Sequence, residues 1–423
     1  MGNDQKISDL RRRRLKNALW GLFIGDALAM PAHWYYNIEN IPKAFNGGIR
    51  GYVDPPHPHP DSFMVGMSYE PDVENAKRLG RPYDILHEHA RFYNTSYSTL
   101  QIRNTERENE HGNPVPPLEA RIHYHHGLKA GENTLGAHLV RVLMRTVIGH
   151  GRYDPNAFIE GFIEHMTTSG RNRDPYTEFY IRRWFENYAG GSEPHACAEL
   201  QRHMWSIGSH GGIIRPMVVS MLAESVYQGL GLAIEHQNLT HRSENVASAL
   251  GVLIPLLGAL LRGEDPGKTI SSYAHTISIA RVTGEELSAA YRAHNGPDNI
   301  PKPEMWALHT TLTGAHLDVD RLIRDHSDQE VVGRLFSIAC YPEQGLPLLL
   351  YLAQKYNVDV EATLFANANA GGDNVHRGMI LGVIVGAAND GLPSHLMQGL
   401  VAFDELNDEI EAFTDIALSG KAI

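Results

Sequence analysis

Hydrophobic residues at helical spacing dominate the pattern along this chain. From Leu10 to Met30 the apolar positions recur every three or four residues, which predicts a buried helix that ends at Pro31. The same period returns after Thr134. It predicts further helices over residues 155–168, 175–188, 215–231, 243–263, 268–281, 283–294, 345–356, 358–369 and 376–390. Alternating strand patterns are scarce, so the expected fold class is all-α.

The helical pattern is lost between about Asn37 and Arg121. Proline-rich stretches such as Asp54–Pro60 and Asn113–Pro117 predict an irregular insertion there, with room for short helices. Small residues inside later helices, such as Gly382 and Gly386, favour close packing of one helix against another. We therefore expect one compact helical domain over residues 1–423, with the insertion packed over a cleft.

Composition and charge disfavour several classes of protein. The formal net charge of −12 disfavours a nucleic-acid binder, because phosphate binding needs a basic face, and a small-molecule partner is more natural. No uninterrupted run of about 18 apolar residues and no signal peptide are evident, so no membrane partner is expected. Two distant cysteines, Cys197 and Cys340, suit a reducing compartment, and we expect a cytoplasmic protein.

Two segments near the predicted N-terminal helix carry polar groups in apolar surroundings. Asp26 lies within the helix, and an ionised carboxylate there needs a partner. His33, Trp34 and Tyr35 follow Pro31, where the chain leaves the helix and can line a pocket. Asp26 is equally well explained as a structural group, and the aromatic residues as core.

Glycine and oxygen-bearing residues precede several other predicted helices. Glu132 and Asn133 stand before the helix that follows Thr134, where such side chains hold a hard cation or cap the helix. Gly371, Gly372 and Asp373 precede the last predicted helix, where an anion site and an ordinary glycine turn with an Asp cap are both open. Less specific are the segments Gly208–Pro216 and Leu239–His241.

In this order, the segments resemble the motifs of the ADP-ribosylglycohydrolase family, which includes dinitrogenase reductase activating glycohydrolase, the ADP-ribosylhydrolases and the J1 crystallins. Gly25–Pro31 resembles the opening Gly-Asp-Ala-Leu-Gly-x-Pro element. Gly208–Pro216 is similar to the glycine-rich Met-Arg-x-x-Pro element, Leu239–His241 to the Thr-His element, and Gly371–Asp373 to the start of Gly-Gly-Asp-Thr-Asp-Thr. The resemblance implies an orthogonal helical bundle with a cleft that holds two Mg²⁺ ions. It also implies an enzyme that hydrolyses the glycosidic bond joining ADP-ribose to a protein side chain or another acceptor.

The chain departs from this family pattern at the metal ligands. Gly131–Thr134 replaces Thr-Asp-Asp-Thr, Val375 and His376 replace the second Asp and the Thr of the last signature, and His33 replaces the catalytic Glu. Fewer negative ligands weaken the attraction for hard dications. We therefore expect one Mg²⁺, a different metal or none. His33 could act as an acid or base, and His376 with His123, His125 or His126 could bind a softer ion.

These observations lead to a hydrolase hypothesis: cleavage of a glycosidic bond in a ribosyl substrate, either ADP-ribosylated protein or a smaller nucleoside- or sugar-like compound. The alternative is a non-catalytic, crystallin-like or binding relative with the same fold. The candidate catalytic residues are Asp26, His33, Glu132 and Asp373. The candidate metal ligands are Glu132, Asn133, Asp373 and His376. The candidate substrate-binding residues are Trp34, Tyr35, Gly211, Gly212, Arg215, His241, Gly371, Gly372 and Asn374.

Overall fold

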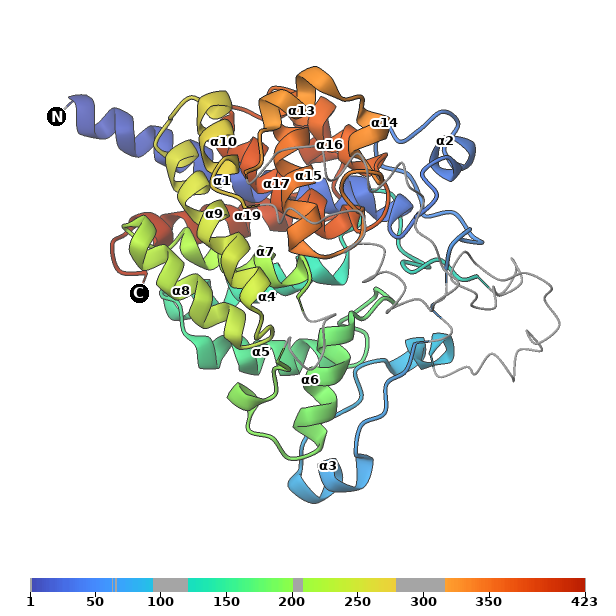
Figure 1. Cartoon of the computed structure of the whole chain (residues 1–423). Helices are drawn as coiled ribbons and strands as arrows, with labels where there is room; N and C mark the ends of the chain where they lie inside the picture. The colour runs from blue at the N-terminus through green and yellow to red at the C-terminus, as the bar shows by residue number, and fades with distance from the viewer. Residues whose placement is uncertain are drawn as a thin grey trace.

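The described part of the molecule is built from helices (Figure 1). The computed structural model describes residues 2–62, 64, 67–93, 121–200, 208–278 and 316–422. Over these residues no strand is present, and β pairing is limited to isolated bridges such as that between Leu200 and Arg242. The all-α fold class expected from the hydrophobic pattern is therefore confirmed.

In the described part of the chain, the helices follow one another in a fixed order. They are α1 (Gly2–Ala29), η1 (Met30–Ala32), α2 (Asn40–Ala44), α3 (Val73–Leu79), η3 (His87–Phe92), α4 (Leu135–His150), α5 (Pro155–Thr167), α6 (Phe179–Ala189), η6 (Pro194–Ala196), α7 (Gly211–Ser220), α8 (Val226–Asn238), α9 (Glu244–Leu261), α10 (Pro266–Ala274), α13 (Val319–Asp325), α14 (Asp328–Val331), α15 (Pro342–Lys355), α16 (Val360–Ala368), α17 (Asn374–Ala388), α18 (Ser394–Gln398) and α19 (Phe403–Leu418).

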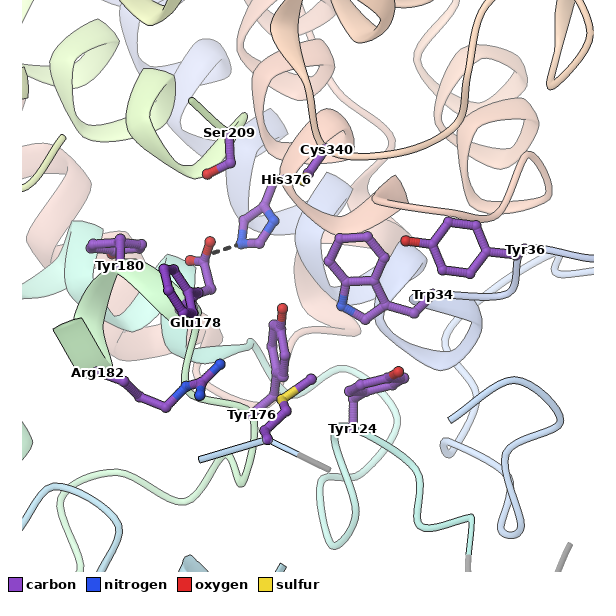
Figure 2. A pocket seen from close by; sticks show the side chains of 12 residues that line it. Trp34, Tyr36, Tyr124, Tyr176, Glu178, Tyr180, Arg182, Ser209, Cys340 and His376 are labelled. Atoms are coloured by element: carbon purple, nitrogen blue, oxygen red, sulfur yellow. Dashed lines mark ion pairs between the residues drawn. The ribbon is translucent and has the colours of Figure 1, made fainter. Parts of the chain in front are cut away.

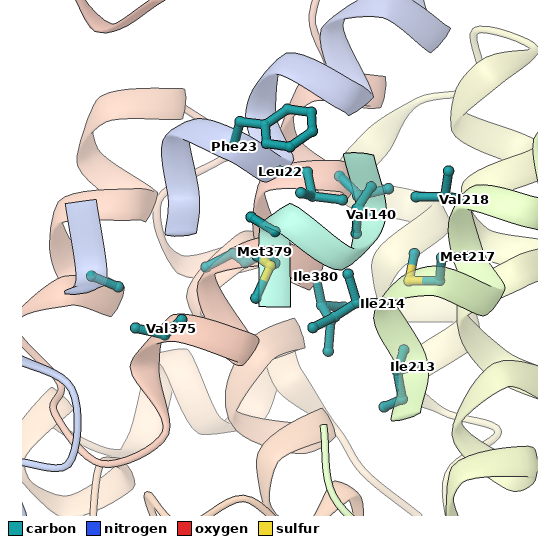
Figure 3. Close-up of a cluster of buried hydrophobic side chains, with 14 of the residues drawn as sticks. Leu22, Phe23, Val140, Ile213, Ile214, Met217, Val218, Val375, Met379 and Ile380 are labelled. Carbon is teal, nitrogen blue, oxygen red and sulfur yellow. The ribbon is translucent and has the colours of Figure 1, made fainter. Parts of the chain in front are cut away.

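Helices α1 and α17 form the most extensive pair and approach each other through glycines. A Cβ atom at Gly382 would lie 2.0 Å from the backbone oxygen of Gly21, and one at Gly25 would lie 2.1 Å from that of Gly378. Because neither contact tolerates a side chain, these glycines allow backbone to meet backbone. Figure 3 shows the adjoining apolar cluster, in which Val140 of α4 and Ile214 of α7 lie with residues of the α1–α17 pair.

Several predicted boundaries differ from the structure. The predicted helix over 215–231 is two helices, α7 and α8, separated by residues 221–225, and the hydroxyl of Ser225 caps the second by accepting from Gln228. The predicted helix over 175–188 begins only at Phe179. The sequence pattern did not indicate α19, and the helix predicted over 283–294 lies outside the described residues.

Helix α9 is long and apolar enough to cross a membrane by length and composition alone, although no such segment was expected from the sequence. It packs against α7, α8, α10, α15 and α17. Most of its large apolar side chains, Leu253 and Leu257 among them, are buried in these contacts. In this structure α9 is a core helix.

The expected irregular insertion contains the short helices α2, α3 and η3 in its described part. Residues 94–120 lie outside the described residues. The main chain at Ser68 accepts a hydrogen bond from Arg182 of α6, and Met67 lines the cavity considered below. This part of the insertion therefore lies beside the N-terminal end of α6, where the candidate site is also located.

Candidate active site

Two left-handed glycines place Asp373 at the start of α17. Gly371 and Gly372 have φ values of +62° and +61°, and a Cβ atom on either would lie within 2.2 Å of the backbone oxygen of Tyr35 or Ile338. The Asp373 amide donates to the Ile338 carbonyl over 2.8 Å. Both glycines are therefore required by the turn and its close contacts.

Three histidines surround the buried carboxylate of Asp373. Its Oδ1 lies 3.2 Å from Nε2 of His33 and 2.6 Å from Nδ1 of His376, and its Oδ2 lies 3.0 Å from Nδ1 of His210. Burial opposes ionisation, but the charge of His376 and the hydrogen bonds from the three rings hold the pKa of Asp373 well below its usual value. Asp373 is thus a buried anion.

His376 joins this buried anion to a second carboxylate. Its Nε2 lies 3.1 Å from Oε1 of Glu178. Burial lowers the pKa of His376, yet the charges of Asp373 and Glu178 outweigh burial and raise that pKa well above the ordinary value. A protonated ring donates from both nitrogens, which fits a carboxylate on each side.

The network continues on the other side through His33. Burial lowers the pKa of His33 to about 3, so its ring is neutral. If Nε2–H donates to Asp373, Nδ1 must accept from His125, whose Nε2 lies 2.7 Å away. The Nδ1 atom of His125 in turn lies 2.8 Å from Oδ1 of Asp174. A continuous hydrogen-bonded path therefore runs from Asp174 to Glu178.

This path reaches a cavity at Glu178 and His376 (Figure 2). The cavity has a volume of about 670 Å³, including the part open to solvent. Its described lining consists mainly of aromatic side chains: Trp34, Tyr36, Tyr124, Tyr176, Phe179 and Tyr180, with Met67, Arg182, Ser209 and Cys340. An apolar pocket with a few convergent polar groups is the usual form of a small-molecule site.

The sequence interpretation missed Glu178, which precedes α6. Its carboxylate lies against the first residue of α7, where a Cβ atom on Gly211 would be 2.7 Å from Oε2. Glycine at that position makes room for the carboxylate, and the helix N-terminus favours its negative charge. The signal in the sequence was Asp174–Pro175, since a residue before proline disfavours helix and indicates a turn at this point.

Asp26 lies outside this path and bridges α1 to the start of α4. Its Oδ2 accepts from the Thr134 amide and from Nδ2 of Asn133, each over 2.8 Å, and its Oδ1 accepts from the Thr134 hydroxyl over 2.6 Å. Burial raises the pKa of Asp26 against these hydrogen bonds. Asp26 and Asn133 are therefore committed to each other and to the helix junction.

The recorded partners of Glu132 do not include the other candidate catalytic residues. Its Oε1 pairs with Arg173 over 2.5 Å, and its Oε2 accepts from the Lys129 amide over 2.7 Å. The expected grouping of Glu132 with Asp373 is not found. Asn133 is buried against Asp26, whereas the neighbouring Glu132 side chain, 13% exposed, is held by Arg173 and the Lys129 amide.

Arg215, Gly212 and His241 lie behind the cavity wall. Arg215 donates to the Tyr180 hydroxyl over 2.9 Å and to the Thr240 hydroxyl over 2.8 Å. The His241 ring packs against Tyr180 with centroids 4.0 Å apart, and a Cβ atom on Gly212 would lie 3.0 Å from that ring. The predicted substrate-binding residues of this group thus support Tyr180 and do not themselves line the cavity.

Two more of the predicted substrate-binding residues, Tyr35 and Asn374, do not line the cavity. Tyr35 is fully buried against Phe45 and His59, and Asn374 is fully buried with its amide donating to the Ala368 carbonyl. Trp34 is the residue of this predicted set that the cavity lining contains.

His33, Asp373 and His376 are close enough together to be considered as a metal site. Their chemistry does not fit the two-Mg²⁺ centre, because Mg²⁺ prefers oxygen and this trio offers two nitrogens and one carboxylate. Glu132 and Asn133, the other expected oxygen ligands, are engaged elsewhere. Among the described residues, the oxygen-rich ligand set implied by the family resemblance is therefore not assembled.

Comparisons with known proteins agree with this fold. A solved structure described as an ADP-ribosylglycohydrolase-related protein complex aligns with a TM-score of 0.55 and 16% identity, covering 97% of this chain and 99% of that one. At this identity the likeness shows the fold alone. A comparison with curated protein sequences found no match. The sequence profile of ADP-ribosylglycohydrolase matches residues 7–421. The chain therefore belongs to the ADP-ribosylglycohydrolase family, and a glycohydrolase-type function is what this membership supports in general.

Proposed function

We propose that the protein hydrolyses the glycosidic bond of a ribosyl compound bound in the aromatic cavity, with Glu178 as the catalytic carboxylate. The observation that carries the proposal is the ion pair between Glu178 and His376 at the cavity wall, backed by the buried anion Asp373. A carboxylate facing a cavity and held by a buried network is a suitable general base.

The proposed chemistry needs few groups. As the bond between the anomeric carbon and the departing group breaks, Glu178 accepts a proton from the water that attacks this carbon, and that proton then passes to the departing group. The negative charge of Glu178 stabilises the oxocarbenium-like transition state. His376 holds the carboxylate in place from one side. Burial raises the pKa of Tyr176 well above its ordinary value, so its hydroxyl keeps its proton. Figure 2 shows this hydroxyl pointing toward Glu178 and His376, where it can donate to the substrate.

The surrounding residues supply positioning and shape. Asp373, His33 and His125 do not line the described cavity, and we assign them the role of holding His376 and its proton. The aromatic lining excludes water and offers faces to a sugar or base. No step in this scheme passes through a magnesium ion, because the ligand set does not fit one.

The test compares two glutamates at the two ends of one helix. Glu178 has 11% of its side chain exposed, and Glu186 has 13% exposed but pairs with Arg183 away from the cavity lining. Glu178→Gln is expected to lower kcat/KM for ribosyl substrates about 10³-fold, while Glu186→Gln stays within about twofold.

Substrates for this assay should include ADP-ribosylated arginine and serine peptides and free nucleosides. Equal activity of the two variants would contradict the role of Glu178. If the protein binds ribosyl compounds but turns over none of them, the non-catalytic binding protein becomes the better description.

A further inference from the structure

Arg182 of α6 brings a buried positive charge to the wall of the cavity. The residue is 6% exposed, and it belongs to the described lining. Figure 2 shows Arg182 and Glu178 on the same side of this cavity. Burial lowers the pKa of Arg182 from its ordinary value, but a guanidinium stays protonated at any physiological pH. The cavity wall therefore contains a fixed cation.

The recorded partners of this cation are all neutral. Its Nε atom donates to the Thr177 carbonyl over 3.2 Å, and its Nη1 atom donates to the Ser68 carbonyl. The guanidinium also lies over the rings of Phe179 and Tyr93, at 5.4 Å and 5.9 Å from their centroids. Carbonyls and aromatic rings orient a guanidinium but do not neutralise its charge.

No carboxylate among the described residues forms an ion pair with Arg182. The two glutamates nearest to it along the chain pair elsewhere, Glu178 with His376 and Glu186 with Arg183. Burial of a charge without a counter-charge is unfavourable. An anionic group of a ligand would supply this counter-charge, so the cavity favours a ligand that carries one.

The guanidinium also keeps hydrogen-bond donors for such a group. It has five N–H groups, and the two carbonyls use one on Nε and one on Nη1. The Nη2 atom has no recorded partner in the described part of the chain and carries two of the remaining N–H groups. Adjacent N–H groups of arginine match two oxygens of one phosphate. Arg182 therefore has both the charge and the donors of a phosphate-binding residue.

The spacing of Arg182 and Glu178 indicates where this phosphate lies on the substrate. The Arg182 amide donates to the Glu178 carbonyl over 3.2 Å, which places the two residues one helical turn, about 5.4 Å, apart. If Glu178 acts at the anomeric carbon, an anion bound by Arg182 lies beside the same sugar. In a ribosyl compound the 5′-phosphate is separated from the anomeric carbon by one sugar ring and one CH₂ group.

The described lining offers a counter-charge to one phosphate. Its other cationic side chain, His376, lies between Asp373 and Glu178. Apart from Glu178, the remaining residues of the described lining carry no charge. A second phosphate would therefore find no free cation in this part of the lining.

Building on the function proposed above, we propose that Arg182 binds a phosphate and that the substrate is a ribosyl compound with a single 5′-phosphate, of the nucleoside 5′-monophosphate class. The guanidinium anchors the phosphate at one end of the sugar, and Glu178 faces the anomeric carbon at the other end. The aromatic side chains of the cavity pack against the sugar and the base.

The substrate class is tested with nicotinamide riboside, nicotinamide mononucleotide and NAD⁺, in which the same glycosidic bond is accompanied by no phosphate, one phosphate and a diphosphate. We expect kcat/KM for the mononucleotide to exceed that for each of the other two at least about tenfold. Equal or faster hydrolysis of the riboside would overturn the phosphate site, and equal or faster hydrolysis of NAD⁺ would overturn the single-phosphate class. Either result would leave the hydrolase proposal intact.

The role of Arg182 is tested with Arg182→Gln, which removes the charge but keeps an amide that can donate to a carbonyl. The preference for the mononucleotide over the riboside should fall from at least about tenfold to about one. Arg183→Gln is the matched control and should keep the preference, because Arg183 pairs with Glu186 and Glu199 and is not part of the described lining. The same preference in both variants would contradict a phosphate contact at Arg182.

Calorimetry on the wild-type protein needs no variant and separates the phosphate site from catalysis. AMP is expected to bind at least about tenfold more tightly than adenosine, and more tightly than ADP-ribose. This ranking without hydrolysis of any probe would support the phosphate site and contradict the catalytic proposal. Adenosine binding as tightly as AMP, ADP-ribose binding more tightly than AMP, or binding of none of the three would overturn the inference.

Discussion

Asp26 and Asp373 are both fully buried carboxylates at motifs of the family signature, yet their surroundings differ in kind. Asp26 accepts from a main-chain amide, an amide side chain and a hydroxyl, all at one helix junction. Asp373 accepts from imidazoles, one of which continues to Glu178 and the cavity. Burial and hydrogen bonding are common to both, so a connected path to a cavity is what distinguishes a candidate active site from a structural carboxylate.

The same substitution at the two positions tests this distinction most strongly. Asparagine at position 26 can keep two hydrogen bonds of Asp26, because its oxygen accepts the two N–H groups, and it reverses the third, because its amide donates to the Thr134 hydroxyl oxygen. Asp26→Asn is expected to cost about 1 kcal/mol of folding free energy and leave kcat/KM within about threefold.

Asp373→Asn removes the charge that holds His376, and we expect kcat/KM to fall about 10²- to 10³-fold. Denaturant unfolding and steady-state kinetics on both variants check the pair. Similar kinetic losses at positions 26 and 373 would mean that the distinction drawn here is wrong.

A smaller effect, this time on the free energy of unfolding, is expected at the contact between α1, which contains Asp26, and α17, which begins after Asp373. Gly382→Ala would place a Cβ atom 2.0 Å from the Gly21 oxygen and force the helices apart, which should destabilise the protein by about 3 kcal/mol. Gly251→Ala on α9 is the control, since no atom lies within 4 Å of its Cβ position, and it should stabilise by about 0.5–1 kcal/mol. Unchanged stability of Gly382→Ala by urea unfolding would show that the close approach is not needed.

A fall in pH should lower the free energy of unfolding through His59, whose ring contacts the segment that carries Trp34. The His59 ring donates to the His33 carbonyl over 2.8 Å and accepts from the Asp61 amide over 3.0 Å, and burial lowers its pKa to about 3. The contribution of His59 to the free energy of unfolding is full above pH 6.5, which is its pKa in the unfolded chain. This contribution is lost as the pH falls from 6.5 toward 3. The expected slope from this residue is about 1.4 kcal/mol per pH unit.

Unfolding between pH 6.5 and 5 in wild type and His59→Gln measures this slope. Glutamine donates to the same carbonyl but does not titrate, so the variant should lose stability less steeply. Parallel profiles would indicate that His59 is already protonated in the folded state.

The smallest expected effect is that of magnesium. Because Glu132 and Asn133 are engaged elsewhere and Asp373 is surrounded by histidines, millimolar Mg²⁺ or its removal with a chelator should leave the melting temperature and kcat/KM unchanged. A rise in kcat/KM of about tenfold or more with Mg²⁺ would show that an oxygen-rich site forms on binding.

Long, strongly periodic helices were predictable because their pattern and their packing agree. This holds for α1, α4 and α9. The break between α7 and α8 was not found, since Met221, Leu222 and Ala223 continue the apolar run and only Ser225 indicates a new start. Helix α19 was missed although Leu406, Ile410 and Phe413 recur at helical spacing on its buried face.

The site was only partly predictable, and the reason is geometric. Asp373, His33 and His376 were candidates, and the structure brings them together. His125 was one of three neighbouring histidines, and its contact with His33, 92 residues away, is what distinguishes it. Glu178 lay within a segment interpreted as helix, where a charged residue is ordinarily a solvated surface group.

The glycine contacts between α1 and α17 also bear on how the chain is made. Residues near Gly21 leave the ribosome long before those near Gly382, so the long N-terminal helix waits without its main partner for nearly the whole of synthesis. At about 5–20 residues per second this interval lasts tens of seconds. Until it ends, the apolar face of α1 is exposed to chaperones and to other nascent chains, and a product that ends before Asp373 lacks the carboxylate that the histidines surround.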